Sequence, residues 1–366
     1  MKTFIIAEAG ANHDRDFDKA VRLIRVAAGA GADAVKFQLY TSKKLYVENT
    51  GDIGKFKDVS KLIESIEMPV EWVPKLMEVC EDSSIEFMCT PFDEESCDLL
   101  VSCGMKRIKI AAFESKDLRL VRHFASHKLP VVFSAGIGTS PDAVLATINA
   151  IRLVGNEEEI TVLHCNSSYP TPFEDINLGQ LAVLRELLSD VPGTRVGLSD
   201  HTPGILIPPI AVTHGASVIE KHFTLDRMSK GPDHPFAIEP DELTRMCRDI
   251  RRAEKVMGRR GGAYTHSESS EEMYIAQRSL VTSIDVKAGE RFGPHNVTTR
   301  RPWKTEFMSA ELFDEVVSGG VSLKDIPAGT PIRCLDITWK TLNVVCYRLN
   351  QMPHKTFTGG CPKSRA

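Results

Sequence analysis

The sequence predicts an α/β protein: a closed (β/α)₈ barrel of the TIM-barrel type, followed by a small mixed α/β domain. Short apolar runs alternate with longer amphipathic stretches through residues 1–258, which is the pattern of parallel strands joined by helical crossovers. Eight such units fit into about 255 residues, the usual size of such a barrel. No G-x-G-x-x-G string follows the first strand, which weakens a dinucleotide-binding open sheet. A seven- or nine-unit α/β fold is the alternative.

The strands are predicted from β-branched and apolar runs, and the helices from the amphipathic stretches that follow them. The predicted strands are Phe4–Glu8, Asp33–Gln38, Glu86–Thr90, Arg107–Ala111, Pro130–Ser134, Ile160–Cys165, Arg195–Ser199 and Ser217–His222. Among the predicted helices are Asp16–Gly29, Glu71–Ser83, Asp117–His127, Ser140–Val154 and Pro240–Met257.

The predicted domains are the barrel over residues 1–258, a linker over 259–277, the small domain over 278–340 and a poorly ordered tail over 341–366. The linker begins in a stretch that is glycine-rich and basic, then rich in serine and acid, with little to bury. The small domain contains two similar strings, D-V-K-A-G-E and D-I-P-A-G-T, which predict an internal pseudo-repeat. The tail carries basic residues among scattered prolines and glycines.

The composition excludes several classes of protein. Among 366 residues, 45 Lys and Arg face 49 Asp and Glu, a net charge of −4, so no global positive field attracts nucleic acid or a membrane. Nine cysteines without a C-x-x-C pair indicate neither a disulfide framework nor a zinc ribbon. No apolar run approaches a membrane span or a signal peptide. We therefore expect a soluble cytoplasmic protein with no nucleic-acid or membrane partner.

In a barrel of this type, active sites lie at the carboxyl ends of the strands and in the loops that follow. Alternation along a strand places residues two apart on the same side, as for Lys36 with Gln38 and Glu220 with His222. The polar residues at these ends are Glu8, Asn12, His13, Lys36, Gln38, Thr90, Asp93, Lys109, Glu114, Ser134, Asn166, Ser167, Tyr169, Ser199, Asp200, His201, Glu220, Lys221 and His222.

Two histidines close the last two strands, His201 and His222. Adjacent strand ends can bring both imidazoles to one borderline divalent cation and leave open coordination positions for catalysis. The alternative is that each is a hydrogen-bonded structural residue.

Two lysines, Lys36 and Lys109, lie on the second and fourth strands. With the hydroxyls of Thr90, Ser167 and Ser199 they can form a phosphate cradle. Two alternatives stay open. Each lysine can pair with an acidic neighbour such as Glu8 or Glu114, or a Schiff-base lysine at Lys109 or Lys221 can make a metal unnecessary.

Seven motifs in order resemble the sialic acid synthase family, whose members make nonulosonic acids from phosphoenolpyruvate. They are IIAEAGANH, DAVKFQ, CTPFD, IKIAAFE, CNSSYPTPFEDINL, VGLSDHTPGI and VIEKHFTLDR, followed by GPDH. The resemblance covers residues 3–258 and continues into 278–339, which is similar to the antifreeze-protein-like (SAF) domain of this family. It implies a metal-dependent condensation of phosphoenolpyruvate with the open-chain aldehyde of an N-acetylated amino sugar, releasing phosphate.

The resemblance also implies roles for individual residues. It makes His201 and His222 the ligands of a divalent ion, Mn²⁺ or Mg²⁺, and it makes Glu8, Lys109 and Glu114 catalytic. Glu114 is then placed to take a proton from the water that adds to the substrate. The residues implied to bind the two substrates are Lys36, Gln38, Thr90, Ser167, Tyr169, Ser199 and Asp233, together with Arg301.

Three departures from the family pattern bear on specificity. Ala112 stands where serine is common, which removes one phosphate donor, and Ser167 stands where some members have asparagine. Phe113, in place of glycine, resembles the pseudaminic acid branch. An acceptor of the N-acetylmannosamine type is the first expectation. A 2,4-diacetamido-6-deoxy hexose, for pseudaminic or legionaminic acid, is the alternative, and a catalytically degenerate sugar-binding protein is an alternative of another class.

The R-R-P string of the small domain contains Arg301. In the family that this sequence resembles, an arginine here reaches the active site of the partner subunit and contacts the acyl group of the sugar. The resemblance therefore implies a domain-swapped homodimer. The alternative is that Arg301 makes a surface ion pair within its own domain.

Overall fold

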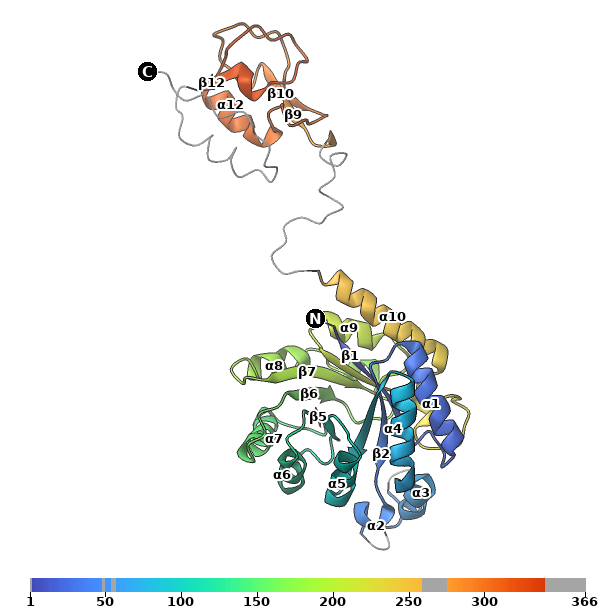
Figure 1. The fold of residues 1–366 in the computed structure, drawn as a ribbon. Helices are drawn as coiled ribbons and strands as arrows, with labels where there is room; N and C mark the ends of the chain where they lie inside the picture. Colours follow the sequence, from blue (N-terminus) through green and yellow to red (C-terminus); the bar gives the residue numbers. More distant parts are fainter. Residues whose placement is uncertain (1, 48–49, 54–56, 259–274, 340–366) are drawn as a thin grey trace. The chain divides into compact units, whose positions relative to one another are not determined.

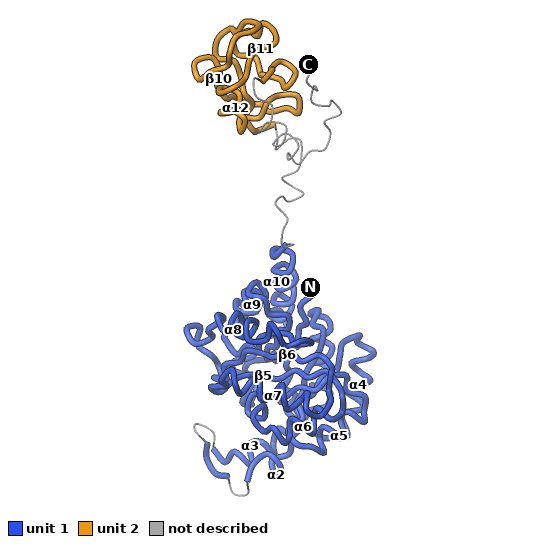
Figure 2. The backbone as a smooth tube through the Cα atoms, turned by 90° about the vertical axis from the view of Figure 1, so that its left-hand side faces the viewer, with its two compact units in different colours: residues 1–258 blue, residues 259–366 orange. Residues whose placement is uncertain are grey.

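The structure is a computed structural model that describes residues 2–47, 50–53, 57–258 and 275–339. The chain divides into two compact units, residues 1–258 and 259–366 (Figure 2). Most of the predicted linker and all of the predicted tail, 341–366, lie outside the described residues. Among the described helices, none is both long enough and apolar enough to cross a bilayer.

The first unit is an eight-stranded parallel barrel, which confirms the predicted fold class (Figure 1). The strands lie in the order β3-β2-β1-β8-β7-β6-β5-β4, and β3 also contacts β4. Every strand lies within two residues of its prediction at either end. The bounds are β1 Phe4–Gly10, β2 Ala34–Leu39, β3 Glu86–Pro91, β4 Ile108–Ile110, β5 Val131–Ala135, β6 Ile160–Cys165, β7 Thr194–Asp200 and β8 Val218–His222.

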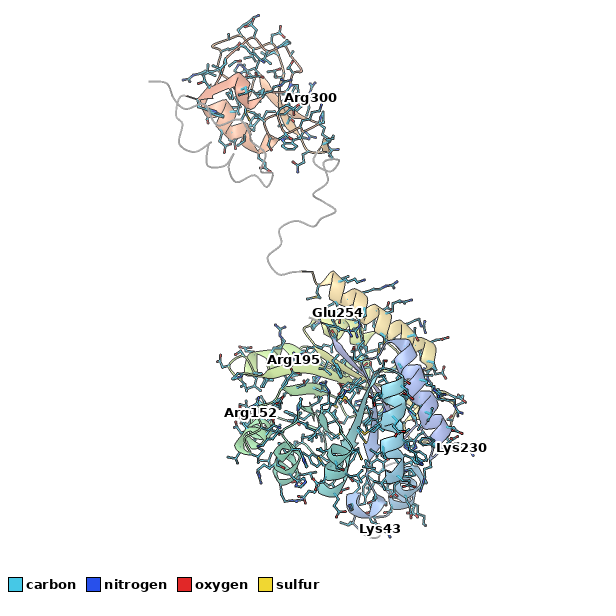
Figure 3. The ribbon with its side chains drawn as sticks, viewed as in Figure 1. Lys43, Arg152, Arg195, Lys230, Glu254 and Arg300 are labelled. Atoms are coloured by element: carbon cyan, nitrogen blue, oxygen red, sulfur yellow. The ribbon has the colours of Figure 1, made fainter. Side chains whose placement is uncertain are left out.

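Helices surround the strands, and charged side chains such as Lys43 and Lys230 stand on the outer surface (Figure 3). Several helices begin at an N-cap whose side-chain oxygen accepts a backbone N–H, for example Asp16 from Lys19 and Ser140 from Ala143. The bounds are α1 Phe17–Ala30, α2 Ser42–Leu45, α3 Val59–Ile66, α4 Val73–Asp82, α5 Glu94–Ser102, α6 Leu118–Ser126, α7 Pro141–Leu153, α8 Gln180–Leu187, α9 Ile207–Thr213 and α10 Pro240–Val256.

The inside of the barrel contains an apolar plug, one side chain from each of six strands. Gly197 of β7 faces this plug, and the lack of a side chain there has a steric reason. A Cβ at Gly197 would lie 2.5 Å from the Val218 carbonyl oxygen and 2.6 Å from Leu163 Cδ2. The plug is therefore already filled to contact at β7. Its buried members are Ile6, Ala34, Met88, Val132, Leu163 and Val218.

A polar layer lies directly above the plug. Two residues further along a strand, the side chain faces the same side again. On the six strands that form the plug, that step gives a polar or sulfur-bearing side chain, and these are Glu8, Lys36, Thr90, Ser134, Cys165 and Glu220. All six are buried. The interior of the barrel therefore changes from apolar to largely polar over two residues along each of these strands.

The second unit has its own small apolar core and two antiparallel strand pairs. Its strands are β9 Ser279–Thr282, β10 Val297–Arg300, β11 Gly320–Ser322 and β12 Ile337–Trp339, with α12 at Phe313–Gly319. The predicted pseudo-repeat is confirmed by reciprocal hydrogen bonds. The Ala288 N–H donates to Asp325 Oδ1 at 2.9 Å, and the Ala328 N–H donates to Asp285 Oδ1 at 2.8 Å. Each turn thus holds the other.

Candidate active site

The carboxyl ends of the strands enclose a polar cavity of about 50 Å³. Most residues that the sequence singled out meet here. The lining residues are Glu8, Lys36, Gln38, Thr90, Phe92, Lys109, Ala111, Ala112, Phe113, Ser134, Cys165, Tyr169, Ser199, His201, Glu220 and His222.

Strand register places Glu8 between a cation and an imidazole. Glu8 on β1 lies opposite Lys36 on β2 and opposite His222 on β8. Lys36 Nζ lies 2.5 Å from Glu8 Oε2 and donates to Thr90 Oγ1 at 3.1 Å. Gln38 Nε2 donates to Glu8 Oε1 at 2.9 Å. The predicted alternative in which Lys36 pairs with Glu8 therefore describes this side of the cavity.

Glu220 links both lysines. Its Oε1 lies 3.7 Å from Lys36 Nζ and 3.9 Å from Lys109 Nζ, and it accepts from Ser199 Oγ at 3.2 Å. Its Oε2 is buried without a hydrogen-bond partner. Glu220 is among the polar strand ends but not in the predicted site. Its placement two residues before His222, on the same side of β8, is the signal that could have added it.

Lys109 occupies the other side of the cavity. Its ammonium donates to Ser134 Oγ at 2.9 Å and to the Ile110 carbonyl at 3.0 Å. Ser134 is a second residue that the predicted site leaves out, although it ends a predicted strand. Lys109 Nζ also lies 3.9 Å from Glu220 Oε1, so the acidic neighbour with which it forms an ion pair is Glu220 rather than Glu114.

Burial and neighbouring charges shift the pKa values of the two carboxyl groups, and those of the two lysines, in opposite directions. Burial raises the pKa of Glu8, and the nearby Glu220 charge raises it further against the effect of Lys36. Burial would also raise the pKa of Glu220, but Lys109 and Lys36 lower it below its ordinary value. Burial lowers the pKa of Lys109, whereas for Lys36 the two carboxylates more than offset burial and raise it. Glu220 is therefore the carboxylate that stays charged, and Glu8 is the one suited to hold a proton.

The two histidines face one another at the cavity, with ring centroids 5.3 Å apart. His201 Nδ1 lies 2.7 Å from the Asn166 carbonyl oxygen, so Nδ1 carries the proton and Nε2 is left for a ligand. His222 Nδ1 is buried without a hydrogen-bond partner and lies 3.7 Å from Asp233 Oδ2. Burial lowers the pKa of both rings, which keeps them neutral. Neutral imidazoles with an unused nitrogen fit a divalent ion.

Aromatic rings and a close backbone turn frame this pair. The Tyr169 ring lies 4.3 Å from that of His201, and the Phe236 ring lies 5.1 Å from that of His222. Gly10 has φ +51°, and a Cβ there would lie 2.7 Å from Asp233 Oδ2. A side chain at Gly10 would therefore displace the Asp233 carboxylate from the histidines.

The other predicted residues do not line the polar cavity. Ser167 Oγ lies 3.7 Å from Cys165 Sγ. Glu114 follows β4 outside the cavity lining, with Oε2 buried and without a hydrogen-bond partner, and burial raises its pKa. Lys221 donates to Asp200 at 2.7 Å and does not line the cavity, which removes it as a Schiff-base candidate there. Arg301 is exposed in the second unit, directly after β10.

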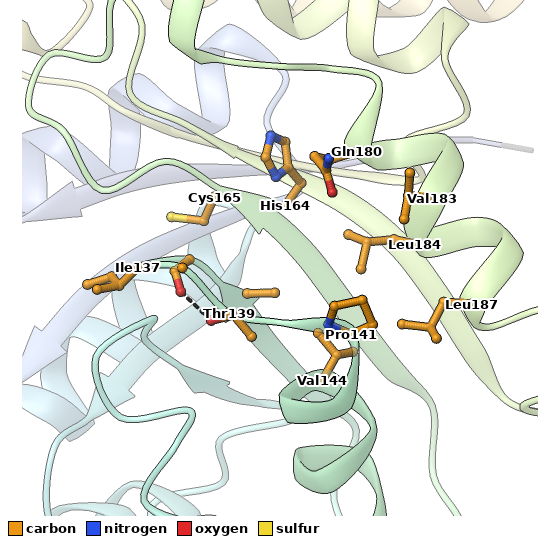
Figure 4. Close-up of a pocket in the computed structure, with 13 residues that line it drawn as sticks. Ile137, Thr139, Pro141, Val144, His164, Cys165, Gln180, Val183, Leu184 and Leu187 are labelled. Atoms are coloured by element: carbon orange, nitrogen blue, oxygen red, sulfur yellow. Dashed lines mark hydrogen bonds between the residues drawn. The ribbon is translucent and has the colours of Figure 1, made fainter.

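A separate pocket of about 190 Å³ lies between the β5–α7 loop and α8 (Figure 4). Thr139 Oγ1 donates to the Gly136 carbonyl and holds this loop. Val144, Leu184 and Leu187 make much of the wall apolar. The pocket shares Cys165 with the polar cavity but none of its cations, so it offers no comparable chemistry.

Residues 23–261 match the NeuB family, and residues 277–338 match the SAF domain. The chain belongs to the NeuB family. An N,N'-diacetyllegionaminic acid synthase of Campylobacter jejuni is 36% identical over 91% of this chain and 99% of that protein. A pseudaminic acid synthase of the same species is 34% identical over 91% and 96%. The crystal structure of a sialic acid synthetase from Leptospira borgpetersenii, in complex with citrate, has a TM-score of 0.68 at 33% identity, covering 75% of this chain and 91% of that one.

These relatives and the two domains confirm the resemblance seen in the motifs. The chain is an enzyme of the nonulosonic acid synthase kind, with a NeuB barrel and a SAF domain. Its polar cavity lies at the end of the barrel where enzymes of this architecture carry out their chemistry.

Proposed function

We propose that this enzyme condenses phosphoenolpyruvate with the open-chain aldehyde of an acetamido hexose, and releases phosphate and a nonulosonic acid. The observation that carries the proposal is the meeting of two features in one buried cavity. A pair of neutral imidazoles lies 5.3 Å apart, and two lysine ammonium groups line the same space. The imidazoles suit the aldehyde side of the reaction, and the ammonium groups suit the phosphate side.

The phosphoenolpyruvate side is formed by Lys36, Lys109, Thr90 and Ser199. The lysines supply compact positive charge, and the hydroxyls supply directed donors to phosphate oxygens. Ser134 already accepts from Lys109 and orients its ammonium. Ala112 lines the cavity without a donor, so the lysines and the remaining hydroxyls hold the phosphate. Both reactants then meet in one small volume, which supplies part of the rate gain.

The aldehyde side is formed by His201 and His222. Their unused nitrogens can hold Mn²⁺ or Mg²⁺, and a bound divalent ion supplies Lewis acidity toward a carbonyl oxygen. The Asn166 carbonyl fixes the tautomer of His201, which is the usual role of such a backbone contact. Gln38, Tyr169 and Asp233 surround this pair and are proposed to contact the sugar.

Two carboxyl groups, Glu114 and Glu8, are proposed to transfer the protons of the reaction. C3 of phosphoenolpyruvate bonds to the aldehyde carbon, a water oxygen bonds to C2, and the C2–O bond to phosphate then breaks. Glu114 is proposed to take the proton of that water, since its raised pKa makes it a stronger base than an ordinary glutamate. Glu8 is proposed to hold the proton that the sugar oxygen receives, since burial raises its pKa.

Two classes of acceptor are candidates. The N-acetylmannosamine type is the first expectation from the sequence. The similarity to synthases of diacetyllegionaminic and pseudaminic acid favours a 2,4-diacetamido-6-deoxy hexose as the second. Phe113, which lines the cavity and is 65% exposed, adds an apolar surface at its edge. We also propose that Arg301 completes the sugar site from the partner subunit of a homodimer.

The test is phosphate release from phosphoenolpyruvate in the presence of Mn²⁺ and a panel of acetamido sugars. Release with one class of sugar and not the other assigns the acceptor. Release that survives EDTA, with phosphoenolpyruvate or pyruvate trapped on Lys109 by borohydride, would replace this mechanism by a Schiff-base aldolase. No release with any sugar, in a folded protein, would favour a degenerate sugar-binding protein.

A further inference from the structure

Helices α5 and α6 lie side by side on the outer layer of the barrel, and they share a cluster of three potential metal ligands (Figure 1). Asp98 comes from α5. His123 comes from α6, and His127 is the residue that caps the end of that helix. None of the three lines the polar cavity, and the proposed reaction uses none of them.

The geometry of the cluster is convergent. His123 Nε2 lies 2.7 Å and His127 Nε2 lies 2.8 Å from the same oxygen, Asp98 Oδ1. The two ring centroids are 5.6 Å apart, and the three ligand atoms lie within 4.8 Å of one another. Spacing of four residues along a helix puts both imidazoles on one face, one turn apart.

We propose that Asp98, His123 and His127 form a second, external site for a divalent cation of the Zn²⁺ class. Two imidazoles and one carboxylate are a donor set that a borderline cation such as Zn²⁺ prefers. With three protein ligands, a water completes a tetrahedral shell.

Two features prepare this site. An ion pair between Arg119 of α6 and Glu94 of α5 already joins the two helices next to the cluster. The histidine side chains are 31% and 23% exposed, so an ion can reach them while the helix surface restricts their motion. The bound ion would join α5 to α6 and would favour the folded state, because the unfolded chain does not hold the three ligands together.

The test titrates Zn²⁺ by calorimetry, and Co²⁺ by visible absorption, into the full chain carrying His201→Ala and His222→Ala. This background removes both proposed metal ligands at the barrel mouth. We expect one equivalent of Zn²⁺ to bind and tetrahedral Co²⁺ to absorb strongly. Adding His123→Ala should weaken binding at least about tenfold, in line with the loss of a direct ligand. Adding His214→Ala, an exposed histidine elsewhere on the barrel, should not.

Two outcomes would overturn the proposal. One is the absence of Zn²⁺ binding in the folded background protein. The other is binding that neither His123→Ala nor Asp98→Asn weakens. If the double-alanine background does not fold, the wild-type chain and His127→Ala are compared instead. The affinity for one equivalent of Zn²⁺ should then fall at least about tenfold in the variant, and unchanged Zn²⁺ affinities would refute the site. No arm depends on turnover, so the result stands apart from the proposed reaction.

Discussion

Two neighbouring layers inside the barrel, the apolar plug and the polar mouth above it, are formed by the same strands but differ in their side chains. At the plug, side chains such as Met88 and Leu163 are fully buried and apolar. One pleat further, the ionisable side chains of Glu8, Lys36 and Glu220 are also buried. Removing ionisable groups from water is costly even when they form ion pairs, so the mouth carries a desolvation cost that the plug avoids. Residues that stabilise the barrel and residues that can carry out chemistry are therefore two positions apart along six of its strands.

The amino-terminal end also contains charge, but there the charge is satisfied. Asp33 accepts from Lys2, from the Ile5 N–H at 2.9 Å and from Arg251 at 2.6 Å. At the mouth, by contrast, buried polar atoms lack hydrogen-bond partners. Within the described part of the barrel these are Glu8 Oε2, which has only its ion pair with Lys36, His13 Nε2, Glu114 Oε2, Thr202 Oγ1, Glu220 Oε2 and His222 Nδ1, and all lie at or after the carboxyl ends of strands. Unsatisfied groups therefore mark the end that receives ligands.

The largest effect is expected at the mouth. His222→Ala should lower kcat by about 10³-fold or more, because it removes one of two proposed metal ligands. The midpoint of thermal unfolding should stay the same or rise, because the variant loses a buried polar atom without a partner. Steady-state phosphate release and circular dichroism measure the two quantities. His214→Ala is the matched control, and ordinary turnover by His222→Ala at normal Mn²⁺ would refute the ligand assignment.

At the plug we expect the opposite: a large loss of stability with little change in activity. Met88→Ala should cost about 2–5 kcal/mol of unfolding free energy, because it leaves a cavity in a tightly packed layer. Its kcat/KM, measured at a temperature where it is folded, should stay near the wild-type value. Met228→Ala is the control, because Met228 is 88% exposed. A loss of activity as large as the loss seen for His222→Ala would show that the two layers are not separable.

At the amino-terminal end of the barrel, Asp33→Asn should cost about 1–2 kcal/mol in unfolding free energy. Burial alone would raise the pKa of Asp33, but hydrogen bonds from Lys2, Ile5 and Arg251 lower it below its ordinary value. Its contribution is therefore complete above the unfolded pKa of about 4 and is lost as pH falls through the lower, folded pKa. The stability gap between wild type and variant should shrink in urea titrations below about pH 4. A gap that grows on acidification would contradict this sign, and Asp190→Asn is the exposed control.

The smallest effect is expected from the second unit. Arg301→Ala should raise the KM for the sugar about tenfold, which corresponds to the loss of one charged hydrogen bond. The KM for phosphoenolpyruvate should not change. Arg300→Ala, an exposed neighbour, serves as the control. An unchanged sugar KM would show that Arg301 does not contact the sugar, and would contradict the proposal that a partner subunit completes the site.

The barrel could be predicted because parallel strands buried on both faces give continuous apolar runs that are easy to delimit. The strand ends then supplied a set of polar residues that do meet in one cavity. What the pattern could not supply is the pairing between strands. Glu220 lies near Lys36 and Lys109 because the three strands that carry them converge in the barrel. The spacing of residues along the sequence does not predict these distances between strands.

Other features depend on tertiary context for the same reason. The helices α2 and α3, inserted between β2 and α4, have only 4 and 8 residues. Helices this short depend on tertiary packing for their stability, so the sequence pattern alone did not predict them. Glu114 is a strand-end carboxylate like Glu8, yet the turn after β4 keeps it outside the cavity lining. Residue type alone could not separate these two glutamates, because only the path of the loop does.

The most direct test of the account is a crystal structure of the full chain with Mn²⁺ and phosphoenolpyruvate, with anomalous scattering used to locate the ion. We expect manganese between His201 and His222, and the phosphate against the ammonium groups of Lys36 and Lys109. An ion bound away from both histidines, or a phosphate that contacts neither lysine, would contradict it.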